Sequence, residues 1–283
     1  MKYYLFIHFK SGPEILTPPL QSKSSRYYEL DVFRGIAVLL MVIYHFLFNL
    51  DYFGIWQMPA WFWPQQLYGF PITIMFIGVA GISLSLAAAK TKDTKTLTKR
   101  LIKRGAYIFA LGLFITAATL IYPRDGAILF GVLHLIGVST ILAIPFLLSF
   151  TKEAQGLGKY KEKAAWSIPL VFGIIVILVS QAVEKISGPI WMVPIGIHPY
   201  GIYMLDYEPL FPWFGIVLVG VAVGAWLYPK GVRRFSFSFL KNEPLFLKPV
   251  SWVGRHSLLI YFVHQPILLA GLWLSGVIKL GVF

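Results

Sequence analysis

The sequence predicts an all-α protein, a polytopic transmembrane helix bundle of about seven spans. Hydrophobic residues make up 57% of the 283 residues and charged residues only 13%, whereas soluble domains carry about 25% charged residues. Aromatic residues reach 17%, which is typical of proteins with interfacial belts of Trp and Tyr. Seven apolar stretches are long enough to cross a bilayer: about 30–50, 69–89, 102–122, 127–150, 165–183, 209–228 and 253–280. The fifth is the weakest, because Pro169 lies in its first turns, and the last is long enough to tilt or to extend beyond the bilayer.

The positive charge of the chain predicts its orientation in the membrane. Most of the 25 Lys and Arg residues, which give a net charge of +13, fall in alternate connections between the spans. By the positive-inside rule, the N-terminus is cytoplasmic and the C-terminus lies outside. Residues 1–28 then form a cytoplasmic segment and 29–283 a single transmembrane domain. Topology explains the charge without a nucleic-acid partner, and anionic membrane lipids are the expected contacts. We expect an integral protein of the plasma membrane of a prokaryote.

The first span carries charged and titratable groups where a bilayer helix is normally apolar. Arg34 and His45 are eleven residues apart, about three helical turns, so they share one face with a separation of about 16 Å along the axis. Buried charge is costly in hydrocarbon and therefore marks a candidate functional site. A cation at one end and a proton-transfer group at the other suit a long substrate with a polar head. Asp31, three residues before Arg34, either belongs to that site or forms a helix-start pair that neutralises the cation.

Two further histidines lie in other predicted spans, His134 in the fourth and His264 in the seventh. A lone membrane histidine is equally compatible with a hydrogen-bonded packing role, but three at overlapping depths favour a shared polar cavity. No HxxxH or HExxH spacing is present, so no metal site is expected. The chain has no cysteine, which excludes disulfides, thiolate metal sites and a cysteine nucleophile. Arg255 opens the predicted seventh span, where it either snorkels to the headgroups or joins an anion clamp with Arg34, Lys103 and Arg104.

Four sequence blocks resemble one family of membrane enzymes. They are Leu30-Asp-Val-Phe-Arg-Gly-Ile-Ala with Met41-Val-Ile-Tyr-His45, Leu129-Phe-Gly-Val-Leu-His134-Leu-Ile-Gly-Val, Asp206-Tyr-Glu-Pro-Leu-Phe-Pro-Trp213-Phe-Gly, and Val253-Gly-Arg-His-Ser-Leu-Leu-Ile-Tyr-Phe-Val-His264-Gln-Pro. In this order they are similar to the heparan-α-glucosaminide N-acetyltransferase catalytic-domain family, over about residues 26–275. The resemblance implies transfer of an acyl group, from cytoplasmic acetyl-CoA or another acyl-CoA, to a hydroxyl or amine of a glycan or lipid-linked sugar at the outer face.

The resemblance also implies roles for the candidate residues. Arg34, and with it Arg255, Lys103 and Arg104, would hold the CoA phosphates, and Asp31 would support Arg34. His45 would be the base or the acyl-accepting group, and Asp206, His134 and His264 would orient His45 or the acceptor. One departure concerns His45 itself. The lysosomal branch carries a histidine in the loop after this helix and an Asn at the His45 position, whereas the loop 49–68 here has no histidine.

Two other classes of protein remain open on the sequence. A proton-coupled transporter or lipid-translocating protein would use the intramembrane histidines as proton carriers, although no inverted repeat supports it. A seven-helix photoreceptor would need a lysine in the middle of its last helix, and Lys279 lies at the outer edge instead. The acceptor, the acyl chain and the oligomeric state are not encoded in these motifs, and a homo-oligomer is compatible with them.

Overall fold

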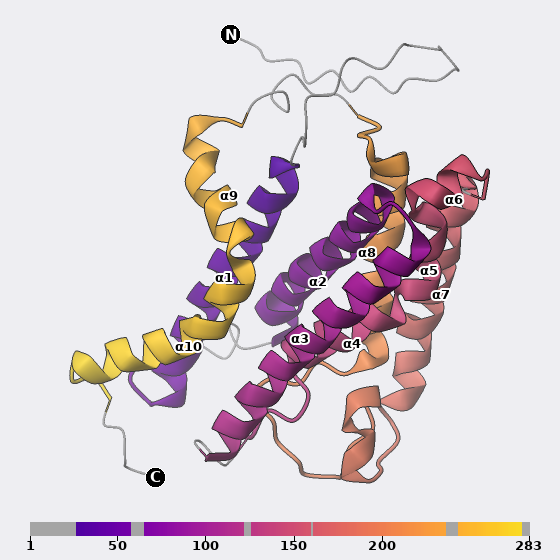
Figure 1. The fold of residues 1–283 in the computed structure, drawn as a ribbon. Coiled ribbons are helices and arrows are strands. Elements are labelled where there is room, and N and C mark those ends of the chain that lie inside the picture. Colours follow the sequence, from indigo (N-terminus) through magenta and orange to yellow (C-terminus); the bar gives the residue numbers. More distant parts are fainter. Residues whose placement is uncertain (1–26, 58–64, 122–125, 160, 236–242, 279–283) are drawn as a thin grey trace. The chain divides into compact units, whose positions relative to one another are not determined.

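The computed structural model describes residues 27–57, 65–121, 126–159, 161–235 and 243–278. These residues form helices joined by loops (Figure 1), and within the described ranges the β-structure is a single bridge between Ser187 and His198. The predicted all-α class is therefore confirmed. The chain divides into two compact units, one made of 1–76 with 235–283 and the other of 77–234. Most of the predicted segment 1–28 lies outside the described residues.

The first unit contains α1 (Tyr28–Tyr52), the beginning of α2 (Gln65–Lys90), the short η5 (Leu245–Leu247), α9 (Lys248–Arg255) and α10 (Ser257–Leu274). Helix α9 packs on the start of α1 with main chain against main chain. A Cβ atom added at Gly254 would lie 1.8 Å from the carbonyl oxygen of Asp31, and one added at Gly35 would lie 2.0 Å from that of Val250. Only glycine permits this approach, so the two glycines allow α1 and α9 to pack in direct main-chain contact.

The predicted seventh span, 253–280, is not one helix. His256 leaves helical geometry (φ −102°, ψ 17°) and separates α9 from α10. Its side chain donates to the carbonyl of Trp252, at 2.8 Å, and its N–H is shared between the carbonyls of Trp252 and Val253, so the carbonyl of Trp252 accepts two hydrogen bonds from His256 at this break. Arg255 was expected to open the last span, and it is instead the last residue of α9. The span itself is Ser257–Leu274.

The second unit holds the main hydrophobic core. Its elements are the rest of α2, α3 (Thr94–Ile121), α4 (Val132–Leu142), α5 (Ile144–Leu147), η1 (Leu148–Phe150), α6 (Lys152–Gly156), α7 (Glu162–Val183), η2 (Ile190–Ile195), α8 (Leu210–Leu227) and η3 (Pro229–Gly231). Leu97, Leu135 and Val217 are among the buried side chains of the core. Helices α3 and α4 approach closely at Gly105 and Gly137, as small residues allow in membrane bundles.

The predicted fourth span, 127–150, is bent by 54° between α4 and the segment Ile144–Phe150. Pro145 follows the break, and a proline lacks the N–H that would continue the helical ladder. The bent pair nevertheless runs the length of α3. Before it, the main chain of Ile128 bonds to Thr116 and Thr119 near the end of α3. After it, Lys152 and Glu153 donate to the carbonyls of Thr91 and Lys92, which precede α3.

Counted as one span, the bent pair brings the helical segments able to cross a membrane to seven within the described ranges, in agreement with the sequence. The third of them begins earlier than predicted, at Thr94 rather than 102. Asp93 caps it: its carboxylate accepts hydrogen bonds from the N–H of Thr96, at 2.7 Å, and from the Thr96 hydroxyl, at 2.8 Å. These bonds hold the pKa of Asp93 below its usual value. The basic residues that follow are therefore helical.

Candidate functional site

Two of the predicted histidines meet in the first unit, one on α1 and one on α10. The rings of His45 and His264 have centroids 4.9 Å apart and planes inclined by 69°. His264 is buried, and His45 is half-buried. The ring of Tyr261 lies 5.6 Å from that of His264. In the described part of the chain, no third His, Asp or Glu side chain joins the pair in a group able to hold a metal ion.

The main chain determines which nitrogen of each ring carries the hydrogen. Nδ1 of His45 lies 2.9 Å from the carbonyl oxygen of Met41, and Nδ1 of His264 lies 2.6 Å from that of Tyr261. A carbonyl oxygen only accepts, so both Nδ1 atoms are donors and each neutral ring has its lone pair on Nε2. Nε2 of His264 is buried without a partner among the described residues. Buried polar atoms are normally hydrogen-bonded, so this nitrogen is available to a substrate or a proton.

An amide pair flanks the histidines, and sequence reasoning missed it. Asn49 lies one turn after His45 and donates through Nδ2 to Oε1 of Gln265, at 2.9 Å, while Nε2 of Gln265 donates back to Asn49 at 3.4 Å. Asn49 is buried. The signal was present in the sequence, because Asn49 lies on the same helical face as His45, four residues later, and Gln265 directly follows His264. The four side chains form one polar layer between α1 and α10.

Arg34 lies at the other end of the same face of α1. Its guanidinium donates to Asp31, at 3.1 Å, and to the carbonyl oxygen of Gly254 on α9, at 3.4 Å. The side chain retains 21% of its accessible surface, so it is held in place but still reachable. Between it and His45, the side chains of Val38 and Met41 are buried. The face predicted from spacing therefore carries the cation at one end and the imidazole at the other.

Arg255 belongs to the same unit and is held by a second chain of hydrogen bonds. Its guanidinium donates to the hydroxyl of Ser251, at 2.9 Å, and that hydroxyl in turn donates to the carboxylate of Glu243. Ser251 is fully buried. Arg34 and Arg255 are thus supplied by neighbouring elements, α1 and α9. Lys103 and Arg104 are exposed side chains of α3, which belongs to the other unit.

His134 and Asp206 lie in the second unit and both make contacts at the start of α4. Nδ1 of His134 accepts from the N–H of Gly131, at 3.2 Å, so its Nε2 carries the hydrogen and faces the hydroxyl of Thr116, at 3.3 Å. The carboxylate of Asp206 accepts from the N–H of Val132, at 3.2 Å. Both ring nitrogens of His134 are therefore used, unlike those of His45 and His264.

The segment after Asp206 is anchored in the same region. Tyr207 donates its hydroxyl to the carbonyl oxygen of Val193, at 3.0 Å, and its ring meets that of His198 edge to face. Burial raises the pKa of Tyr207 to about 12, so the hydroxyl stays protonated and remains a donor at physiological pH. The loop between α7 and α8 is thereby tied to the segment that opens α8.

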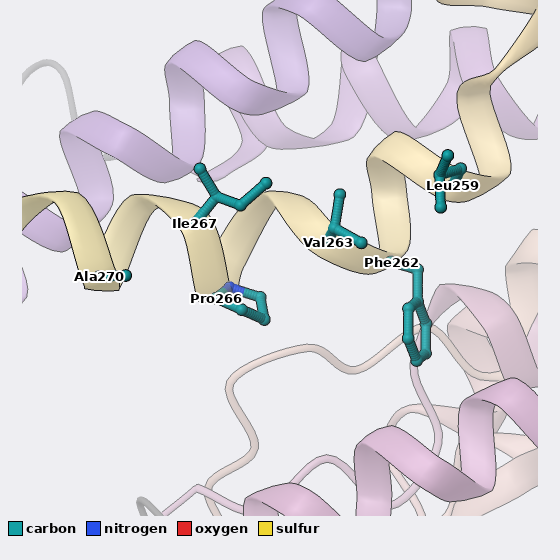
Figure 2. A pocket seen from close by; sticks show the side chains of 6 residues that line it. All are labelled: Leu259, Phe262, Val263, Pro266, Ile267 and Ala270. Carbon is teal, nitrogen blue, oxygen red and sulfur yellow. The ribbon is translucent and has the colours of Figure 1, made fainter.

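The opposite face of α10 is apolar. A surface hollow of about 520 Å³ is lined by side chains of α10 alone. They are labelled in Figure 2: Leu259, Phe262, Val263, Pro266, Ile267 and Ala270. At 100° per residue this stripe lies opposite the face that carries Tyr261 and His264. The hollow offers no side chain for acid–base chemistry and suits contact with hydrocarbon. The chemistry of α10 is confined to the side that meets α1.

Comparison with known proteins gives one match. A family model described as heparan-alpha-glucosaminide N-acetyltransferase, catalytic, matches residues 26–266, a range that includes α1, both histidines of the pair and Arg34. No curated protein and no solved structure matches the chain. The matched range covers most of the sequence and confirms the resemblance of the four blocks. The chain belongs to the heparan-α-glucosaminide N-acetyltransferase catalytic-domain family of membrane transferases.

Proposed function

We propose that this integral membrane protein transfers an acyl group, most simply acetyl, from cytoplasmic acyl-CoA to a hydroxyl or amine of a glycan or lipid-linked sugar at the outer face. The observation that carries the proposal is the face of α1. It holds a guanidinium near one end and, three turns away, an imidazole whose Nε2 is free to accept a proton. The separation of about 16 Å suits the extended arm of an acyl-CoA between its phosphates and its thioester.

In the proposed reaction, His45 acts as the general base. The acceptor oxygen or nitrogen attacks the thioester carbon, its proton passes to Nε2 of His45, and the carbon–sulfur bond breaks. The same proton then passes from His45 to the departing CoA thiolate, so the ring returns to its neutral form. Nδ1 keeps its bond to the carbonyl of Met41 throughout, which fixes the ring while Nε2 exchanges the proton.

The cations are assigned to the donor. Arg34 would bind a CoA phosphate through its guanidinium, which keeps 21% of its surface accessible and is oriented by Asp31 and the carbonyl of Gly254. Arg255 would provide a second contact from α9. Lys103 and Arg104 remain candidates for the same role from α3. Asp31 contributes indirectly, by orienting the guanidinium of Arg34.

His264 is assigned a positioning role beside His45, because the two rings are in contact. A ring with an unprotonated Nε2 would stabilise the imidazolium that forms on His45 during transfer. His134 and Asp206 would shape the acceptor side through the start of α4, as positioning residues. Both accept hydrogen bonds from main-chain N–H groups at the start of α4, so an effect on the acceptor would pass through the loop that they hold.

The first experiment is acetyl-CoA binding to the detergent-purified protein by calorimetry, with Arg34→Gln and Lys159→Gln in parallel. Both variants remove one positive charge, and Lys159 is an exposed lysine of the connection between α6 and α7. We expect Arg34→Gln to weaken binding by about tenfold or more, the usual loss for a charge-assisted bond to phosphate, and Lys159→Gln to leave it unchanged. Equal weakening in the two variants would reduce the role of Arg34 to its charge alone.

The second experiment separates chemistry from binding. His45→Ala should abolish acyl transfer while acetyl-CoA binding and the thermal transition stay close to those of the parent protein. Full transfer by this variant would remove His45 from the mechanism. Failure of the folded parent protein to bind acetyl-CoA or longer acyl-CoAs would contradict the whole proposal.

A proton-coupled transporter remains the alternative, because the fourth span is broken at Ala143 by 54° and broken helices are common at transport sites. Proton uptake into liposomes that depends on His45 and His264, in a protein that does not bind acyl-CoA, would favour it.

A further inference from the structure

A cationic groove lies on the second unit, between the first turns of α3 and η1. Its volume is about 650 Å³, within the range of sites that hold small molecules. One side is formed by α3 and the other by a single residue of η1. The lining residues are Thr94, Lys95, Thr98, Lys99, Ile102, Lys103 and Leu148.

Three lysines follow one another along this groove at helical spacing. Lys95, Lys99 and Lys103 are four residues apart, so they form one row that extends about 12 Å along α3. All three are exposed, and among the described residues no carboxylate pairs with any of their ammonium groups. Like charges at this spacing destabilise a helix. An anion bound between them would relieve that repulsion.

The groove also has an apolar side. Ile102 keeps 46% of its surface exposed between Lys99 and Lys103, and Leu148 faces it from η1. Beyond Ile102 the same face of α3 continues with Ala106 and Ala110, both exposed. These two small side chains define an apolar track on α3, on the line that leads from the lysines into the apolar part of the span. The ligand that fits is an amphiphile with an anionic head.

We propose that this groove binds the headgroup of an anionic phospholipid, with its phosphate between Lys95 and Lys99 and one acyl chain along Ile102 and Ala106. The lining holds no aromatic ring and no side-chain amide, the groups that would recognise an adenine base, so a nucleotide fits it less well. The inference rests on the geometry of α3 and η1 alone and is independent of the acyltransferase proposal.

The test is native mass spectrometry of the purified protein with dioleoyl phosphatidylglycerol or dioleoyl phosphatidylcholine. The parent protein should retain phosphatidylglycerol in preference to phosphatidylcholine. Lys95→Gln/Lys99→Gln should lower retention of phosphatidylglycerol by about tenfold or more, because each lysine near a lipid surface contributes about 1 kcal/mol. Lys103 stays intact in this variant. The matched control, Lys159→Gln/Lys163→Gln, removes the same charge from exposed lysines and should retain the lipid.

A second variant tests the apolar track without changing charge. Ala106→Trp should displace the long acyl chain and lower retention of dioleoyl phosphatidylglycerol, while binding of the short-chain dihexanoyl lipid is preserved. Equal retention of the two headgroups by the parent protein would overturn the proposal, as would equal losses in the two double-lysine variants. Loss of acetyl-CoA binding in Lys95→Gln/Lys99→Gln, with phosphatidylglycerol retained, would assign the groove to the acyl donor and also overturn it.

Discussion

Three histidines of this protein differ in what their second ring nitrogen can do. In His134 both nitrogens have partners, the N–H of Gly131 and the hydroxyl of Thr116. In His45 and in His264, only Nδ1 is hydrogen-bonded to a main-chain carbonyl. A base needs a free lone pair, so the two groups of histidines have different chemical capacities although all three lie in apolar helices. The difference comes from the main chain around each ring and not from the ring.

The amide pair of Asn49 and Gln265 can be tested by removing first one partner and then both. Asn49→Leu should lower the free energy of unfolding by about 1–3 kcal/mol, because it leaves the half-buried Gln265 amide without its partner. The double variant Asn49→Leu/Gln265→Leu should recover most of that loss, since both polar groups are then gone. The measurement is the thermal transition in detergent. A double variant less stable than either single variant would show that the amides do not act as a pair.

Helix α9 depends on a main-chain contact that a single methyl group would break. Gly254→Ala should lower the free energy of unfolding by about 1–3 kcal/mol, because the new Cβ would lie 1.8 Å from the oxygen of Asp31 and one helix must move. Gly271→Ala on α10 is the control. It has open space around it and should gain up to about 1 kcal/mol from helix propensity. If the thermal transitions of Gly254→Ala and Gly271→Ala shift by the same amount, this account of α9 is wrong.

The start of α3 should respond to pH through Asp93. Hydrogen bonds from Thr96 lower the folded-state pKa of this carboxyl below the unfolded value of 3.8. The carboxylate therefore stabilises the folded state above that value, and the contribution is lost as the pH falls through the folded pKa. Asp93→Ala should melt at a lower temperature than the parent protein at pH 7, and the gap should narrow below pH 3.8. If the difference in melting temperature does not change with pH, the Asp93 carboxylate does not stabilise the start of α3.

Hydropathy predicted where the helices cross but not where they break. Spans are predictable because about 20 apolar residues are needed regardless of neighbours. The interruptions at His256 and before Pro145 are local changes of main-chain geometry at one or two residues, which a window average does not detect. The early start of α3 has the same origin, since one carboxylate at Asp93 extends a helix through residues of low hydropathy.

For the candidate site, the sequence predicted which residues share a face of one helix but not which helices meet. Arg34 and His45 were placed on one face because a helical period determines faces within one element. The meeting of His45 with His264, and the separation of His134 from them into another unit, depend on which helices pack together. The row Lys95, Lys99 and Lys103 was visible as charge but not as a groove, because its other side is supplied by Leu148 of η1.

The arrangement of the whole chain across the membrane can be tested directly, because the protein has no cysteine. Hydrogen bonds from Lys152 and Glu153 to the α2–α3 connection favour a fourth span that crosses completely. Single cysteines at Lys92 and Lys159 should then react with a membrane-impermeant thiol reagent from the same side, and one at Tyr200 from the other.

A cysteine added after Phe283 should label together with Tyr200→Cys, from outside the cell. Labelling of Lys159→Cys from the side opposite to Lys92→Cys would make the bent pair a re-entrant loop, and the described helices would then give six spans.

The contact between Arg34 and Gly254 also sets an order of biosynthesis. The two residues are 220 positions apart, and a ribosome delivers the N-terminal one first. While residues 77–234 are being synthesised and inserted, α1 waits in the membrane with Asp31 as the neighbour of its guanidinium but without the carbonyl that α9 will bring. Completion of the first unit is therefore a late event in the life of the nascent chain. A chain that stops before Gly254 lacks this contact between the guanidinium of Arg34 and α9.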